Sequence, residues 1–220
     1  MMSPSRYRAI IFDLDGTLID SSPSILHCFD RAITAAGMQP VLPLDSSLIG
    51  PPLRQTLMKL AGSDDPALLD RLVDGFKECY DTEGYKATRV YPGVEEMLSG
   101  LSSRSIPLAI ATNKRCIPTL KILEHLGWER YFCQVGTLDT PTPPHPDKAA
   151  LISFLLNEMG VTADESLYVG DKWEDGEAAR SNGMPFAAAG WGYGEWDLVT
   201  KPQDWQIAYS PVALTKYISS

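Results

Sequence analysis

A short apolar run near the start of this chain ends at two closely spaced carboxylates, in the stretch AIIFDLDGTLID from Ala9 to Asp20. Runs of this length and composition are typical of strands that are buried on both faces. Aspartate is disfavoured in strands, and two like charges at Asp13 and Asp15 repel each other unless something compensates. The pair is therefore either an ordinary turn at Asp-Gly or part of a chemical site. The ends of the other strands distinguish these two interpretations.

Short apolar runs alternate with helical segments along much of the chain. Further buried strands are predicted at residues 106–111, 133–137, 166–169 and 185–189, and helices at residues 119–126, 148–159, 174–181 and 212–218. Alternation of this kind predicts parallel strands joined by right-handed crossovers. We therefore expect an α/β protein with a Rossmann-like parallel sheet core flanked by helices.

The segment from residue 20 to residue 84 interrupts this alternation. Ser22 and Pro23 are a typical helix start, and apolar residues keep helical spacing from there until Gly37. Two more helices are predicted at 53–61 and 66–80, with no strand between them. The sequence thus predicts an inserted all-helical cap subdomain at 20–84, and a core domain formed by 1–19 plus 85–220.

The charge and the cysteines limit the classes of function. A formal net charge of −9 argues against nucleic acid or an anionic membrane as a partner. No apolar run is long enough for a signal peptide or a membrane span, so we expect a cytoplasmic protein. We expect it to be either a monomer or a homodimer. The four cysteines form no CxxC pair, and we expect them to be reduced and mostly buried.

Polar residues follow the first four of the predicted core strands at their carboxyl ends. The first strand is followed by Asp13 and Asp15, the second by Thr112-Asn113-Lys114, the third by a Pro-rich loop and Lys148, and the fourth by Gly170-Asp171-Lys172-Trp173-Glu174-Asp175. The carboxyl ends of parallel strands meet at one edge of the sheet, where ligands bind. We therefore expect these groups to form one pocket.

Residues of these types can perform phosphoryl transfer. Asp13, Asp171 and the backbone carbonyl of Asp15 are the oxygen ligands that Mg²⁺ prefers. One carboxylate can attack phosphorus, and the other can protonate the leaving oxygen and then activate water. The hydroxyl of Thr112 and the ammonium of Lys148 can hold the phosphoryl oxygens. Gly16 allows the backbone to approach the phosphate closely.

These motifs resemble those of a known family. DLDGT, ATN, a lysine that opens a helix and VGDKWED are similar to the four motifs of the haloacid dehalogenase superfamily, and GDKWEDGEAARSNGM is similar to its phosphoglycolate phosphatase-like branch. The branch often has Lys-Pro after the third strand, whereas this chain has Pro146-Asp147-Lys148-Ala149. The resemblance covers nearly the whole chain, with the helical segment where the branch carries its cap.

The resemblance implies a role for each motif residue. By it, Asp13 is the nucleophile and Asp15 the general acid/base, Thr112, Asn113 and Lys148 bind phosphate, and Asp13, Asp15, Asp171 and Asp175 belong to the Mg²⁺ site. It also implies that the turn Gly50-Pro51-Pro52-Leu53-Arg54 faces the substrate, with Gly50 and Arg54 as contact residues. Lys114 in the second motif and Lys172 in the fourth compete with Lys148 for the role of the phosphate-binding lysine, but both are expected to face solvent. Trp191 and Tyr193 are expected to serve packing.

The sequence favours a Mg²⁺-dependent phosphatase that hydrolyses a small phosphorylated metabolite, such as a phosphoglycolate-like phosphomonoester, through an aspartyl-phosphate. A phosphotransferase or phosphoglucomutase-like enzyme, a nucleotidase and a pyrophosphatase would use the same residues and remain open alternatives. A dehalogenase would not need the acid/base at Asp15. A regulatory binding module without catalytic activity is an alternative from a different class of protein, and the intact set of motif residues argues against it.

Overall fold

The protein is described by a computed structural model, which places residues 6–140 and 142–220. Its main sheet has six parallel strands in the spatial order β5-β4-β1-β6-β7-β8. Their bounds are β1 Ala9–Phe12, β4 Leu108–Thr112, β5 Phe132–Thr137, β6 Ser166–Gly170, β7 Phe186–Ala189 and β8 Gln206–Ala208. Numbered within this sheet alone, the order is the doubly wound 3-2-1-4-5-6, which reverses between β1 and β6.

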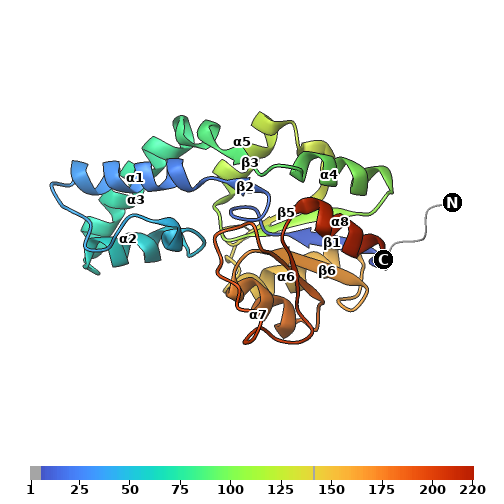
Figure 1. Cartoon of the computed structure of the whole chain (residues 1–220). Helices are drawn as coiled ribbons and strands as arrows, with labels where there is room; N and C mark the ends of the chain where they lie inside the picture. Colours follow the sequence, from blue (N-terminus) through green and yellow to red (C-terminus); the bar gives the residue numbers. More distant parts are fainter. Residues whose placement is uncertain (1–5, 141) are drawn as a thin grey trace.

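Helices cover both faces of the main sheet (Figure 1). α4 (Val94–Ser103), α5 (Cys116–Leu126) and α8 (Pro211–Ser219) cover one face, and α6 (Lys148–Met159) and α7 (Trp173–Ser181) cover the other. Along β1, Ile10 and Phe12 pack into the first apolar layer and Ile11 packs into the second. This burial on both faces explains why the strand is apolar throughout.

A group of helices interrupts the core between β2 (Ile19–Asp20) and β3 (Arg89–Val90), which pair with each other as a short antiparallel ribbon. We call residues 21–88 the helical insertion. It contains α1 (Ser22–Ala35), α2 (Leu53–Ala61) and α3 (Pro66–Thr82), and it lies to one side of the main sheet (Figure 1). Its helices bury an apolar cluster of their own, in which Phe29, Leu57, Leu72 and Phe76 are central.

The predicted fold class is confirmed: the sheet is parallel, helices flank it, and a helical segment is inserted after the first strand. The elements that were not predicted include the two strands of the β2–β3 ribbon, helix α4 and the edge strand β8. Helix α4 does carry a helical signal, because Val94, Met97, Leu98 and Leu101 follow helical spacing and are buried. Residues 1–5 and position 141, which belong to the expected core segment and the Pro-rich loop, lie outside the described residues.

The expectation of reduced cysteines is wrong for two of the four. Cys28 of α1 and Cys79 of α3 form a disulfide, while Cys116 and Cys133 are free. The two partners are separated by 51 positions, and only the packing of α1 against α3 brings them together. Within the described part of the chain, no helix has both the length and the apolar character that a membrane span requires.

Candidate active site

Three carboxylates meet at the carboxyl ends of β1 and β6. These strands pair in parallel with Phe12 opposite Val169, so that Asp13 leaves the sheet beside Asp171. Asp175 follows in the first turn of α7. One carboxylate oxygen from each residue lies within 4.8 Å of the other two, and all three side chains are buried. The strand register therefore explains how residues more than 150 positions apart form one cluster.

The burial of this cluster changes its ionisation. Burial raises the pKa of Asp13 to about 7, and the repulsion of Asp175 and Asp15 adds to this, while the ammonium of Lys148 opposes it. Burial and the same kind of repulsion raise the pKa of Asp171 well above its usual range. Crowded, buried carboxylates with so little positive charge nearby form an all-oxygen donor set that fits a divalent cation such as Mg²⁺.

Two glycines leave the space that these carboxylates occupy. Gly16 has a φ of +87°, and a Cβ on it would lie 2.3 Å from Oδ2 of Asp171. A Cβ on Gly170 would lie 2.5 Å from the side chain of Asp175. Gly16 was predicted for its approach to phosphate, and the structure adds that it is needed for the carboxylate next to it.

Lys148 begins α6, where Asp147 caps the helix by accepting a hydrogen bond from the backbone of Ala150. Its Nζ lies 3.1 Å from Oδ1 of Asp13 and 2.5 Å from Oδ1 of Asp175. The structure thus brings the predicted lysine to the carboxylate cluster, with its side chain 11% exposed. It is positioned to hold an anion next to Asp13.

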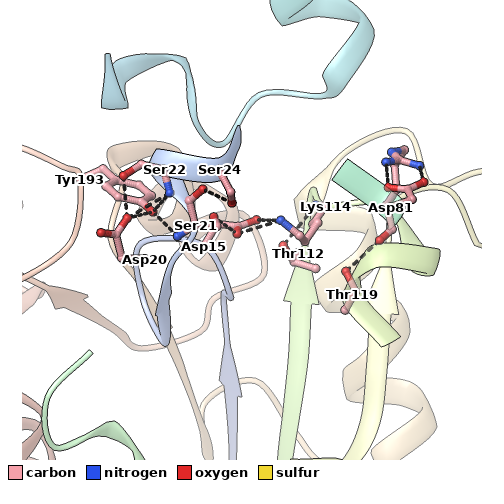
Figure 2. A network of polar contacts seen from close by, with 11 residues as sticks. Asp15, Asp20, Ser21, Ser22, Ser24, Asp81, Thr112, Lys114, Thr119 and Tyr193 are labelled. Carbon is pink, nitrogen blue, oxygen red and sulfur yellow. Dashed lines mark hydrogen bonds and ion pairs between the residues drawn. The ribbon is translucent and has the colours of Figure 1, made fainter. Parts of the chain in front are cut away.

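Asp15 lies beside the cluster but in a different environment. Its carboxylate accepts hydrogen bonds from the ammonium of Lys114 at 3.0 and 3.1 Å and from the hydroxyl of Ser21 (Figure 2). The expectation that Lys114 faces solvent is therefore wrong, since its side chain is only 6% exposed. The same ammonium lies 4.6 Å from the centre of the Tyr80 ring. That ring comes from the helical insertion, so no local sequence signal indicated the contact.

The second motif connects the core to the helical insertion. The hydroxyl of Thr112 accepts a hydrogen bond from the backbone N–H of Lys114 at 3.2 Å, and Thr112 is buried (Figure 2). The side-chain amide of Asn113 donates to the carbonyl oxygen of Gly50 at 2.9 Å. Both residues line one pocket with Asp13, Asp15 and Lys148. Gly50 lines this pocket too.

Arg54 is the predicted site residue that the structure leaves outside this group. It does not line the pocket, and its guanidinium forms an exposed ion pair with Asp70 of α3 at 2.5 Å. The arginine that lines the pocket is instead Arg115, the residue that precedes α5. Its guanidinium donates two hydrogen bonds to the carboxylate of Asp81, a residue of the helical insertion (Figure 2).

Tyr193 has a larger role than the expected packing. Its hydroxyl accepts hydrogen bonds from the backbone N–H groups of Ser21 and Ser22 and donates one to Asp20 at 2.9 Å (Figure 2). Its own backbone N–H donates to Oδ2 of Asp171 at 2.8 Å. One residue of the loop after β7 thus contacts both the carboxylate cluster and the start of the helical insertion.

This arrangement of fold and site defines a hydrolase of the haloacid dehalogenase type, and the comparison with known families agrees. The sequence profile of the family described as "Haloacid dehalogenase-like hydrolase" matches residues 10–189. The chain therefore belongs to the haloacid dehalogenase-like hydrolases.

Individual relatives narrow the class to phosphatases. The chain is 32% identical over 218 residues to a phosphoglycolate phosphatase of Agrobacterium fabrum, covering 95% of this chain and 93% of the relative. It is 31% identical over 217 residues to a 5'-nucleotidase of Pseudomonas aeruginosa, covering 98% and 97%. Among solved structures, a predicted phosphatase from Clostridium acetobutylicum superposes with a TM-score of 0.84 at 26% identity, covering 96% and 98%. The protein is thus a phosphatase of this family.

Proposed function

We propose that the protein is a Mg²⁺-dependent phosphatase that hydrolyses the phosphomonoester of a small metabolite through an aspartyl-phosphate at Asp13. The observation that carries this proposal is the difference between two neighbouring carboxylates. Asp13 faces Asp171, Asp175 and Lys148, whereas Asp15 is held by Lys114 and Ser21. Two carboxylates in different environments can take different roles in one reaction.

The residues that would hold Mg²⁺ are Asp13, Asp171 and Asp175, with the backbone carbonyl of Asp15 as a further oxygen ligand. When bound, the ion would neutralise the charge of these carboxylates and of the substrate's phosphate. Lys148 would bind a phosphoryl oxygen from its position 3.1 Å from Asp13, and the Thr112 hydroxyl would bind another.

The covalent steps follow from these positions. A carboxylate oxygen of Asp13 attacks phosphorus as the bond from phosphorus to the leaving oxygen breaks, and Asp15, which has to be protonated before this step, gives that oxygen its proton. Asp15, now a carboxylate, takes a proton from a water molecule that attacks the phosphorus of the aspartyl-phosphate. This step releases inorganic phosphate and restores both aspartates.

The helical insertion is proposed to act as a cap that excludes bulk water during these steps. The proposed cap, residues 20–84, covers most of this insertion, and 1–19 plus 85–220 would form the core, with hinges in the paired strands β2 and β3. The contacts of Asn113 with Gly50 and of Arg115 with Asp81 support this proposal, because they join the two parts across the pocket.

The names of two relatives suggest phosphoglycolate and a 5'-nucleotide as candidate substrates.

The test is phosphate release from a panel of phosphorylated metabolites with Mg²⁺. Asp13→Asn should abolish turnover while circular dichroism and the melting temperature show an intact fold. Asp30→Asn, the same change at an exposed position on α1, is the matched control and should retain full activity. Ordinary turnover by Asp13→Asn would exclude the aspartyl-phosphate mechanism.

A further inference from the structure

The part of the pocket that the helical insertion supplies contains no charged side chain. The lining residues from this segment are aliphatic, aromatic, glycine or proline, and they include Ile25, Phe29, Ile49, Leu53, Phe76 and Tyr80. The charged lining residues, in contrast, all come from the core. The pocket therefore has a charged end from the core, where phosphate would bind, and an apolar end from the helical insertion, and the two adjoin where the ammonium of Lys114 lies 4.6 Å from the centre of the Tyr80 ring.

Three aromatic rings form one wall of the apolar end. The rings of Phe29 and Phe76 lie 4.8 Å apart between their centres, and Phe76 stacks on Tyr80 at 5.5 Å with an angle of 18° between the planes. Rings in such a row offer apolar surface and the edges and faces that a further ring prefers to contact. An aliphatic or aromatic group bound here would lose contact with water at little polar cost.

The cations that line the pocket already have anionic partners. Lys114 is paired with Asp15, Lys148 with Asp13 and Asp175, and Arg115 with Asp81. Among the described lining residues, none is a cation without such a partner. Since the part of the lining that the helical insertion supplies holds no cation, a carboxylate on a leaving group that reaches it would be buried without a counter-charge, which is unfavourable.

We propose that the leaving group of the substrate is uncharged and presents a flat apolar ring to the wall formed by Phe29, Phe76 and Tyr80. The face of a nucleobase or of a benzyl group meets this description, whereas glycolate, which has a carboxylate and no ring, does not. This inference rests on the proposed phosphatase function, whose phosphate would bind at the charged end of the pocket. The inference selects between substrate classes that share the same chemistry at phosphorus.

The test compares two substrates that differ by one remote charge, benzyl phosphate and 4-carboxybenzyl phosphate, with Mg²⁺ present. We expect kcat/KM to be at least about tenfold higher for benzyl phosphate. A nucleoside 5'-monophosphate should likewise be preferred over phosphoglycolate. Equal values, or a preference for the carboxylated ester or for phosphoglycolate, would overturn the inference.

Binding of the unreactive benzylphosphonate and 4-carboxybenzylphosphonate, measured by calorimetry, separates the inference from the proposed function. Tighter binding of benzylphosphonate without turnover of any phosphate ester would support the apolar site and overturn the phosphatase proposal. Turnover of phosphate esters without this preference in binding or kcat/KM would support the phosphatase proposal and overturn the inference of an apolar site. If neither turnover nor binding is observed, both the inference and the phosphatase proposal are overturned.

A charge added to the apolar end provides the second test. Leu53→Lys places an ammonium at a half-buried position in the lining, and Met58→Lys places one on the same helix at an exposed position outside it. We expect Leu53→Lys to shift the ratio of the two kcat/KM values at least about tenfold toward 4-carboxybenzyl phosphate. Met58→Lys should leave the ratio unchanged. An unchanged ratio in Leu53→Lys would contradict the inference.

Discussion

The ammonium of Lys114 lies 3.0 and 3.1 Å from the two carboxylate oxygens of Asp15 and 4.6 Å from the centre of the Tyr80 ring. The side chains of Lys114 and Asp15 are 6% and 10% exposed, so water screens their interaction little. Lys114 thus links the proposed proton donor to a residue of the helical insertion. Its position couples the chemistry to the placement of the cap.

Lys114→Met should lower kcat by about 10- to 100-fold, because the proposed general acid would lose the group that orients it. It should also lower the free energy of unfolding by roughly 3 kcal/mol, since the variant leaves a nearly buried carboxylate without its partner. Steady-state kinetics and urea unfolding measure the two effects. Lys216→Met on the exposed surface of α8 is the control and should change neither. A wild-type kcat in Lys114→Met would show that Asp15 does not depend on this contact.

Mg²⁺ should raise the melting temperature, and more so at pH 8 than at pH 5. Burial raises the pKa of Asp13 from 3.8 to about 7, so between these values the metal-free folded protein keeps a proton that the unfolded chain releases. The Asp13 carboxyl therefore makes the free energy of unfolding of the metal-free protein fall as the pH rises from about 4 to about 7. A bound cation favours the ionised carboxylates, and protons compete with it at low pH.

Thermal unfolding with Mg²⁺ or with EDTA at both pH values measures this effect. Asp171→Asn should remove the stabilisation by Mg²⁺, whereas Asp74→Asn, at an exposed position of α3, should retain it. Equal stabilisation of Asp171→Asn and the wild type would place the ion elsewhere.

Gly16→Ala should abolish most activity and weaken Mg²⁺ binding, because the added Cβ would collide with Asp171. Gly37→Ala is the matched control: Gly37 also has a positive φ, +76°, but no atom lies within 4 Å of an added Cβ. The control should lose about 1 kcal/mol of stability from backbone strain and keep its activity. Circular dichroism, melting temperature and kcat separate the two effects. Similar losses in both variants would attribute the effect to the backbone alone.

The fold was predictable where the signal is local. Helices α2 and α6 have the predicted bounds, and the buried core strands lie within a few residues of their predicted positions. The strand β8 was missed because Gln206–Ala208 is short and lies at the sheet edge, with little apolar pattern. The disulfide of Cys28 with Cys79 was missed because cysteine spacing alone does not fix pairing.

The site was predictable to the extent that its residues follow strand ends. Asp13, Asp171, Asp175 and Lys148 meet because parallel strands end at one edge, which the alternation of strands and helices already implied. The contacts of Lys114, Arg115 and Tyr193 were not predictable, since their partners come from distant segments. Arg54 was expected at the pocket because the family resemblance implies that its turn faces the substrate, but its guanidinium pairs with Asp70 instead.

Asp81→Asn should loosen the helical insertion from the core. Asp81 forms two hydrogen bonds with the guanidinium of Arg115, and both side chains are less than 20% exposed. Loss of this ion pair should lower kcat/KM by about tenfold through a higher KM, because the insertion would close less firmly over the bound substrate. It should also speed proteolysis of the insertion. Asp70→Asn makes the same change in the same helix, but its ion pair with Arg54 is exposed, and such pairs contribute roughly 0–1 kcal/mol. Asp70→Asn should therefore match the wild type in both measurements. Equal behaviour of the two variants would mean that the ion pair of Asp81 with Arg115 does not hold the insertion closed over the pocket.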